Sequence, residues 1–286
     1  MPRVLIAGCG YLGQAVADLF ILEGWEVEGW TKSAESAQQL STKPYPVQAV
    51  DISNEDQVRA RTGDFDAVIH CASTRGGDVD RYRRVYLDGS RNLLDRFAGS
   101  RILFTSSTSV YAQTNGEWIT EESAAEPKHE RGKILRQAED LVLANRGIVI
   151  RLGGVYGPGR SALLKKFLRG DAVLDPESDR FANQIHRDDA AAAIQLLLRR
   201  EESAGGVYNV VDDQPILQSE CYRSLAAKLK RPPPPVGRST SKRKRGESNK
   251  RVSNAKLRAI DWVPRYPSFA DGMERSVLPS PDIENG

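Results

Sequence analysis

The residues best suited to chemistry near the start of the chain form a glycine-rich loop. Residues 8–13 have the spacing Gly-x-Gly-x-x-Gly, between an apolar run at 4–7 and a helical pattern at 12–23. In a strand–turn–helix unit these glycines permit a tight turn, the approach of a pyrophosphate and close helix packing, while the helix N-terminus favours phosphate. The loop therefore predicts a dinucleotide site, unless its residues are ordinary turn glycines. The predicted contacts are Gly8, Gly10, Tyr11, Leu12 and Gly13.

The residues after the second apolar run indicate which cofactor fits. NAD sites of this kind usually have an Asp or Glu there, which binds the ribose hydroxyls. This chain instead has Thr31, Lys32 and Ser33. Two hydroxyl donors and an ammonium group suit a 2′-phosphate, so the sequence favours NADP over NAD. The alternative is that Lys32 is a solvated loop residue.

Two further segments are expected to line the same site, because ligands of open parallel sheets bind outside the carboxyl ends of the strands. Asp51 and Ile52 follow the third apolar run and are expected to contact the adenine, although Asp51 could instead cap the next turn. The fourth run ends at His70, for which a buried histidine bonded to backbone is the alternative to cofactor contact. The cofactor residues that follow it are Cys71, Ala72 and Ser73.

The first half of the chain alternates short β-branched runs with helical patterns, which is typical of βαβ units. The expected strands are 4–7, 26–30, 47–50, 67–70, 101–105 and 148–151, and the expected helices are 12–23, 33–40, 82–97 and 131–145. Right-handed crossovers then give an α/β fold, a Rossmann doubly wound parallel sheet. We assign 1–155, with 183–200 returning to it, to a dinucleotide-binding domain, and 156–182 and 201–286 to a smaller substrate-binding domain.

Composition argues against several classes of protein. The 286 residues are 40% hydrophobic and 28% charged, with a formal net charge of +3, which is near the average for globular proteins. No apolar run approaches the roughly 18 residues of a membrane span, and the start lacks the pattern of a signal peptide. Three cysteines without paired spacing argue against a disulfide framework or a metal site. We expect a cytoplasmic monomer or homodimer that binds neither membrane, nucleic acid nor metal.

Motifs over nearly the whole chain resemble the extended short-chain dehydrogenase/reductase family, which is the NAD-dependent epimerase/dehydratase-like family. Besides the glycine loop, they occupy 88–94, 104–111, 151–160, 183–189 and 252–264. The resemblance implies an NAD(P)-dependent enzyme with a small-molecule substrate such as a nucleotide-sugar. It also implies a Ser that holds the substrate oxygen, a Tyr that transfers its proton, and a Lys four residues later that lowers the pKa of the Tyr.

The chain departs from this family pattern at the proton-transfer residues. Ser107 aligns with the family Ser, either as a substrate-positioning hydroxyl or as a polar strand end. Anchoring the next helix on 138–142 places Arg131 at the Tyr position and Leu135 at the Lys position, and no tyrosine lies between Tyr111 and Tyr156. The sequence therefore predicts an atypical member, in which Ser107 and Tyr111 are the catalytic candidates. Water, Lys133 or His129 are the other proton sources.

Basic residues in the second half could contact a substrate phosphate. Arg160 follows the Gly-Pro-Gly turn and is expected on the substrate side. By resemblance, an Arg-Gly pair nearly twenty residues before Trp262 reaches the diphosphate of a nucleotide-sugar, and the nearest candidates are Arg243 and Arg245. The alternative for both is a plain surface loop. For His186 the alternatives are a catalytic role and a structural one, and we expect it to tie its helix to the sheet, with Asp188 or Asp189 capping that helix.

Two functions remain open from the sequence. The first is an oxidoreductase or epimerase-like enzyme that acts on a nucleotide-sugar or a small carbonyl compound by an atypical mechanism. The second is a non-catalytic NAD(P)-binding sensor or scaffold. The missing Tyr and Lys favour the second function, whereas the motifs on the substrate side favour the first.

Overall fold

The computed structural model describes residues 1–74, 76–238 and 248–280. The chain divides into two compact units. The first unit comprises Met1–Val110, Ala125–Arg151 and Ala191–Tyr208, and the second comprises Tyr111–Ala124, Leu152–Ala190 and Asn209–Gly286. Each unit is thus assembled from three separate stretches of sequence.

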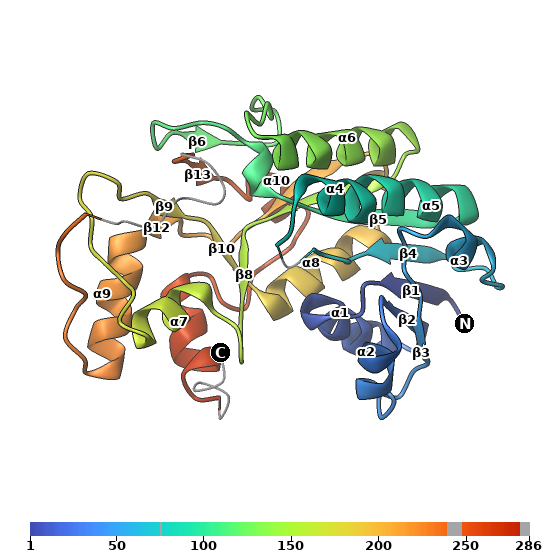
Figure 1. Cartoon of the computed structure of the whole chain (residues 1–286), viewed down its shortest axis with the longest axis horizontal. Helices are drawn as coiled ribbons and strands as arrows, with labels where there is room; N and C mark the ends of the chain where they lie inside the picture. Colours follow the sequence, from blue (N-terminus) through green and yellow to red (C-terminus); the bar gives the residue numbers. More distant parts are fainter. Residues whose placement is uncertain (75, 239–247, 281–286) are drawn as a thin grey trace. The chain divides into compact units, whose positions relative to one another are not determined.

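A seven-stranded sheet with the order β11-β7-β5-β4-β1-β2-β3 runs through the first unit (Figure 1). The pairs β1–β2, β1–β4, β2–β3 and β4–β5 are parallel. Because β1 lies between β2 and β4, the strand order reverses there, which is where ligands of doubly wound sheets bind. This confirms the predicted fold class. The strands are β1 (Arg3–Ala7), β2 (Glu26–Thr31), β3 (Val47–Ala49), β4 (Ala67–His70), β5 (Arg101–Ser107), β7 (Ile148–Leu152) and β11 (Val207–Val210).

Helices cover both faces of this sheet (Figure 1). On one face lie α4 (Val79–Tyr82), α5 (Gly89–Arg96) and α6 (Glu130–Ala144), and on the other lie α1 (Tyr11–Leu22) and α2 (Ala34–Gln39). The short α3 (Glu55–Arg59) precedes β4, and α8 (Arg187–Arg199) precedes β11. Polar side chains cap several of these helices, as in Ser33 for α2, Asn54 for α3 and Asp78 for α4.

One long helical segment contains a turn of π-helix. Residues Arg83–Asp88 form this turn, labelled η1, between α4 and α5. The sequence predicts a single regular helix over 82–97, and the structure differs from this prediction at the π-turn. Single π-turns occur frequently at functional sites.

A buried ion cluster fixes α6 to the sheet. Glu139 on α6 is fully buried, and its carboxylate accepts bonds from Arg151 Nη2 at 2.7 Å and Ser106 Oγ at 2.5 Å. Arg136, one turn away, also pairs with Glu139. Since Ser106 lies on β5 and Arg151 on β7, one carboxylate joins the helix to two strands.

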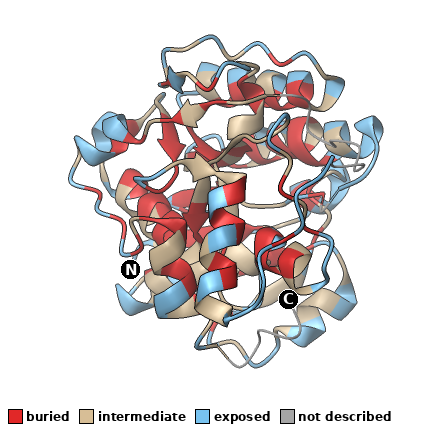
Figure 2. Cartoon of the chain, turned by 90° about the vertical axis from the view of Figure 1, so that its left-hand side faces the viewer, coloured by how far each residue is buried: buried red, intermediate tan, exposed pale blue. Residues whose placement is uncertain are grey.

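The second unit is built from short elements around its own core. Its strand pairs are β8 (Gly154–Tyr156) with β10 (Gln184–His186), β9 (Phe181–Ala182) with β12 (Ile216–Leu217), and β6 (Trp118–Ile119) with β13 (Arg251–Val252). Tyr156, Tyr222 and Phe269 are buried in its hydrophobic core. The foreground helices in Figure 2 carry both buried and exposed residues. The helices of the second unit are α7 (Ala162–Leu168), α9 (Gln218–Leu229), α10 (Ala255–Arg258) and α11 (Phe269–Gly272), followed by the helical turn η4 (Met273–Val277). The first unit has two further short helical turns, η2 (Thr108–Val110) and η3 (Glu201–Ser203).

Within the described ranges, no helix combines the length and apolar character needed to cross a membrane.

Candidate dinucleotide site

The glycine loop forms a cradle that tolerates no side chain at two of its positions. Gly8 has φ +104°, and a Cβ there would lie 2.2 Å from the backbone nitrogen of Ala72. A Cβ on Gly13 would lie 2.4 Å from the carbonyl oxygen of Gly8. Gly8 is required by its positive φ and by the nearby backbone, and Gly13 is required by the nearby backbone alone. The residues present therefore fit the tight turn and the close strand–helix packing of a dinucleotide-binding loop.

Backbone hydrogen bonds tie this loop to the neighbouring strand. The N–H groups of Gly8 and Cys9 both donate to the carbonyl of Trp30, at 3.0 and 2.8 Å. Gly10 begins α1 as its N-cap, and no side chain caps this end of the helix. The helix N-terminus consequently presents backbone and positive dipole, the arrangement that favours a phosphate. Tyr11 and Leu12, in the first turn, are half-buried.

The thiol of Cys9, inside the loop, contacts another side chain of the protein. Cys9 is buried, and its Sγ lies 3.6 Å from the Tyr45 hydroxyl. Burial raises the pKa of this thiol, while the bond to Tyr45 opposes the rise. Cys9 thus stays protonated and packs beneath the loop.

An ion pair joins the two segments expected to bind the adenosine ribose and base. Lys32 Nζ lies 2.8 Å from Asp51 Oδ2, and the side chains are 66% and 22% exposed. The other carboxylate oxygen of Asp51 accepts from Ser53 N–H and Oγ. Burial raises the pKa of Asp51, but the hydrogen bonds from Lys32 and Ser53 outweigh it and the pKa is lowered. Asp51 is therefore an ionised partner of Lys32 that also holds the next turn.

The remaining residues of these two segments have local partners. Thr31 Oγ1 donates to the Ser33 carbonyl at 3.3 Å, and Ser33 Oγ caps α2 by accepting from the Ser36 N–H. Ile52 is 5% exposed, and its side chain fills the space beside Gly89. The structure thus brings Thr31, Lys32, Ser33 and Asp51 together at the carboxyl ends of β2 and β3.

The end of β4 closes the opposite side of the loop. The backbone of Cys71 and Ala72 lies against Gly8, and Cys71 N–H donates to the Ala7 carbonyl at 2.8 Å. Ser73 is exposed. His70 is buried, its Nε2 bonds the Val85 carbonyl at 3.0 Å, and burial lowers its pKa to about 4. Of the two possibilities for His70, the structure shows the buried imidazole bonded to backbone.

The two catalytic candidates lie in different environments. Ser107 is half-buried at the end of β5, and its Oγ accepts from the Ser109 N–H at 3.2 Å. Tyr111 is fully buried within the second unit, where its hydroxyl donates to Asn209 Oδ1 at 2.9 Å and its carbonyl accepts from Lys250 Nζ. Tyr111 is therefore a buried side chain with a partner inside the second unit, and its catalytic role stays a prediction.

The start of α6 holds the two residues that the sequence alignment places at the family Tyr and Lys positions. Arg131 is half-buried, with its guanidinium carbon 5.4 Å from the centre of the Tyr82 ring. Leu135 is 4% exposed and packs in the core. The other proton sources are engaged, because Lys133 pairs with Glu130 at 2.7 Å and His129 Nδ1 caps α6 by accepting from the Gly132 N–H.

Of the basic residues expected on the substrate side, the structure describes Arg160. Arg160 is exposed at the end of a tight turn closed by its two backbone bonds with Gly157. Arg243 and Arg245 lie outside the described residues.

His186 has internal partners. Its Nε2 bonds Ser276 Oγ at 3.0 Å, and its Nδ1 accepts from the Asp188 N–H. Burial lowers its pKa to about 4. Asp189 accepts from the backbone N–H groups of Arg265 and Tyr266, so it ties the start of α8 to the segment after Trp262. These contacts agree with a structural role for the segment.

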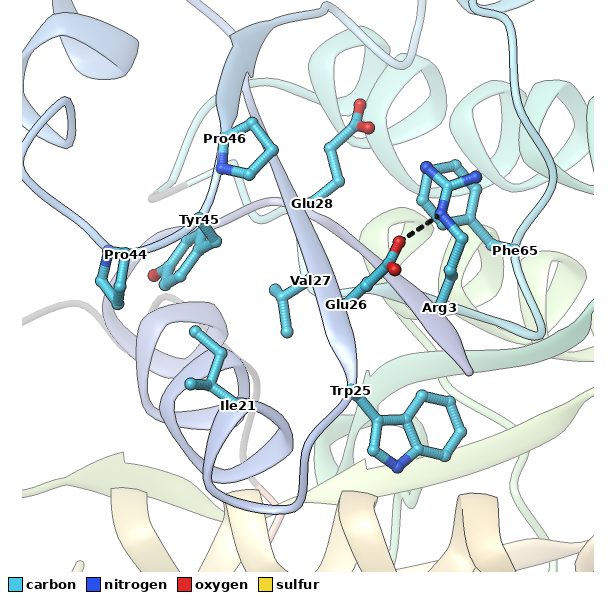
Figure 3. A pocket seen from close by; sticks show the side chains of 10 residues that line it. All are labelled: Arg3, Ile21, Trp25, Glu26, Val27, Glu28, Pro44, Tyr45, Pro46 and Phe65. Carbon is cyan, nitrogen blue, oxygen red and sulfur yellow. Dashed lines mark ion pairs between the residues drawn. The ribbon is translucent and has the colours of Figure 1, made fainter. Parts of the chain in front are cut away.

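Sequence reasoning missed a cavity at the amino ends of β1 and β2 (Figure 3). Its volume is about 320 Å³. Arg3 pairs with Glu26 at 3.3 Å, and Glu28 accepts from Trp30 Nε1 and Gln48 Nε2. The glycine loop lies at the carboxyl end of β1, so this cavity is separate from the dinucleotide site. The remaining lining residues are Ile21, Trp25, Val27, Pro44, Tyr45, Pro46 and Phe65.

The doubly wound sheet and the glycine cradle define a Rossmann-type dinucleotide-binding fold. The chain belongs to the NAD dependent epimerase/dehydratase family, whose model matches residues 4–210. This confirms the family predicted from the sequence motifs.

Individual relatives cover most of the chain. Protein YeeZ of Escherichia coli (strain K12) is 29% identical over 249 residues, which cover 82% of this chain and 86% of YeeZ. A Methylobacillus flagellatus structure assigned to the NAD-dependent epimerases/dehydratases is 29% identical, with a TM-score of 0.78 over 96% of this chain and 97% of that one. The UDP-glucose 4-epimerase of Thermus thermophilus, solved with NAD, is 21% identical, with a TM-score of 0.80 over 96% of each chain.

Proposed function

We propose that this protein is an NAD(P)-dependent oxidoreductase or epimerase-like enzyme acting on a nucleotide-sugar or a small carbonyl compound. The observation that carries the proposal is the cradle at Gly8 and Gly13, which leaves room for backbone alone where the strand order reverses. A bound nicotinamide supplies the hydride chemistry. The glycine loop and the N-terminus of α1 hold the pyrophosphate, and the ends of β2, β3 and β4 hold the rest.

NADP is the proposed form of the cofactor. The acid that binds the ribose hydroxyls of NAD is replaced by Thr31, Lys32 and Ser33. Lys32 is 66% exposed and already holds a carboxylate of Asp51 at 2.8 Å. A 2′-phosphate carries more charge than that carboxylate, so it competes well for the same ammonium group.

The substrate class is proposed from two kinds of support. This chain shares its fold with the Thermus thermophilus UDP-glucose 4-epimerase, an enzyme named for a nucleotide-sugar. Ser107 is half-buried at the carboxyl end of β5, where a substrate oxygen meets the cofactor in parallel sheets. Arg160 and, outside the described residues, Arg243 and Arg245 are the proposed contacts for a substrate phosphate.

A second candidate function is a cofactor-binding sensor or scaffold without turnover. The support for it lies on α6, where the sequence alignment assigns Arg131 and the buried Leu135 to the positions of the proton-transfer Tyr and Lys. In this case the cofactor would bind one conformation of the protein more tightly than another, and the favoured conformation would present a different surface to a partner.

Calorimetric titration with NADPH and NADH tests the cofactor proposal. We expect binding of both, tighter for NADPH, and loss of both in Gly8→Val, because its Cβ alone would meet Ala72 backbone at 2.2 Å. Gly99→Val is the matched control, since Gly99 has open space around it. Nicotinamide absorbance with a panel of UDP-sugars and small aldehydes then separates the two functions. Hydride exchange with any member supports the enzyme, and binding without exchange supports the sensor.

A further inference from the structure

Arg131 is half-buried and lies over an aromatic ring. Its guanidinium carbon lies 5.4 Å from the centre of the Tyr82 ring, and Tyr82 in turn packs on Tyr86 with centroids 5.0 Å apart. Tyr86 stacks on the buried His70. Among residues 1–74, 76–238 and 248–280, no carboxylate pairs with Arg131 and no acceptor takes its N–H groups. The cation–π contact with a supported ring therefore places a cation whose five donors have no acceptor among the described residues.

The charges around Arg131 leave this site positive. Lys133 already neutralises Glu130, the acidic neighbour of Arg131. The pKa of Glu130 is lowered, first by the hydrogen bond from Lys133 and also by the charge of Arg83. Arg131 also lies in the first turn of α6, a helix of 15 residues, where the helix dipole favours an anion.

The chemistry of the guanidinium group limits what Arg131 can do. It stays protonated in proteins, so it does not transfer a proton to a substrate. Its planar fork matches a carboxylate through two parallel hydrogen bonds. If Arg131 stands at the family Tyr position, the residue there cannot transfer a proton, but it can bind a negatively charged group.

A second donor lies at the end of the strand on which α6 packs. The helix contacts β5 and the turn η2 that follows Ser107. Ser107 Oγ accepts from the Ser109 N–H at 3.2 Å, and within the described residues its own hydroxyl hydrogen has no acceptor. The hydroxyl of Ser107 is therefore free to donate to a ligand oxygen.

We propose that Arg131, held against Tyr82, binds a carboxylate of the substrate, with the hydroxyl of Ser107 as the neighbouring donor. The inference rests on the proposed function and makes it narrower: the substrate is a carboxylate-bearing compound, a sugar acid or an oxo acid. A neutral alcohol or aldehyde lacks the group that this arginine binds.

The test is a titration of the NADPH-bound protein with oxamate, a small carboxylate without redox chemistry, followed by cofactor fluorescence. Arg131→Gln is expected to raise the oxamate Kd by about tenfold or more, the effect of losing a charge-assisted hydrogen bond. Arg131→Lys should give an intermediate Kd, because it keeps the charge and loses the fork. Tyr82→Phe keeps the stack and should bind oxamate as the parent does, whereas Tyr82→Ala should weaken binding.

Arg84→Gln is the matched control, because Arg84 is an exposed arginine on the neighbouring π-turn. We expect it to leave the oxamate Kd unchanged. An equal loss in Arg84→Gln, no loss in Arg131→Gln, or no binding of oxamate to the parent overturns the proposal. Tighter binding of inorganic phosphate than of oxamate, dependent on Arg131, overturns the carboxylate assignment.

The NADPH Kd of each variant is measured separately. Failure of the parent to bind NADPH overturns the proposed function. In that case the oxamate titration is repeated by calorimetry on the free protein, so that the anion site is judged alone.

Discussion

Replacing Glu139 with Gln removes the charge at the centre of the buried cluster that joins α6 to β5 and β7. Glu139 is fully buried and the Arg151 side chain is 3% exposed, so the variant leaves a buried guanidinium without its counter-charge. Breaking such a pair from one side costs about 3–5 kcal/mol. With a urea m-value of about 3 kcal/mol/M, the unfolding midpoint falls by about 1 M or more.

Urea unfolding followed by circular dichroism measures this effect, and Glu130→Gln is the control on the same helix. Glu130 is exposed and pairs with Lys133 at the surface, so its replacement should leave the midpoint unchanged. An apolar triple variant, Ser106→Ala with Glu139→Leu and Arg151→Met, should recover most of the loss because it removes the buried charges of Glu139 and Arg151 together, while Arg136 keeps its pair with Asp140.

Two results would refute this reasoning. A midpoint for Glu139→Gln that matches the parent would mean that the cluster contributes nothing to stability. A triple variant less stable than Glu139→Gln would mean that packing, rather than the unpaired charge, sets the cost.

The other predictions concern cofactor choice, pH and turnover. Lys32→Gln should reduce the preference for NADPH over NADH by about fivefold, the scale of one exposed charge contact; an unchanged ratio of calorimetric Kd values contradicts the assignment. The pKa values of His70 and His186 are lowered to about 4, so between about pH 6.5 and 4 the unfolded chain binds more protons, and the free energy of unfolding should fall as pH falls through this window. His186→Asn should make that fall shallower, and a fall of the same steepness argues against the buried neutral imidazole. Finally, the parent should not epimerise UDP-glucose by a tyrosine-dependent route, and rapid turnover with that sugar would show that the alignment of α6 is wrong.

Much of the fold could be predicted from the sequence because its signals are local. The β-branched runs predict strands at 4–7 and 67–70, which match β1 and β4 to within a residue. The π-turn at Arg83–Asp88 could not be predicted, because a regular helix and a π-turn share nearly the same apolar pattern. The two-residue strands of the second unit are equally invisible, since alternation needs four residues or more to be recognised.

Local sequence patterns also identify only part of the candidate site. The glycine spacing specifies a backbone conformation directly, so Gly8 and Gly13 were identifiable. The ion pair between Lys32 and Asp51 depends on β2 and β3 being neighbours, which no local pattern states. Tyr111 was a candidate because of its position after Ser107. Its complete burial against Asn209 comes from a residue 98 positions later in the chain.

Cofactor binding and proton transfer are built from separable parts in this fold. The cradle needs only glycine backbone at the end of β1, whereas proton transfer needs particular side chains near the start of α6. That helix is anchored by Glu139 to β5 and β7 and is capped by His129, and neither contact involves Arg131 or Leu135. An Arg and a Leu at the positions that the sequence alignment gives to the family Tyr and Lys are therefore compatible with the helix and with the cradle. A buried leucine at 135 cannot support a phenolate, and the arginine at 131, over the Tyr82 ring, carries a positive charge. If Arg131 binds a substrate carboxylate as proposed, the protein selects a negatively charged ligand beside its dinucleotide site.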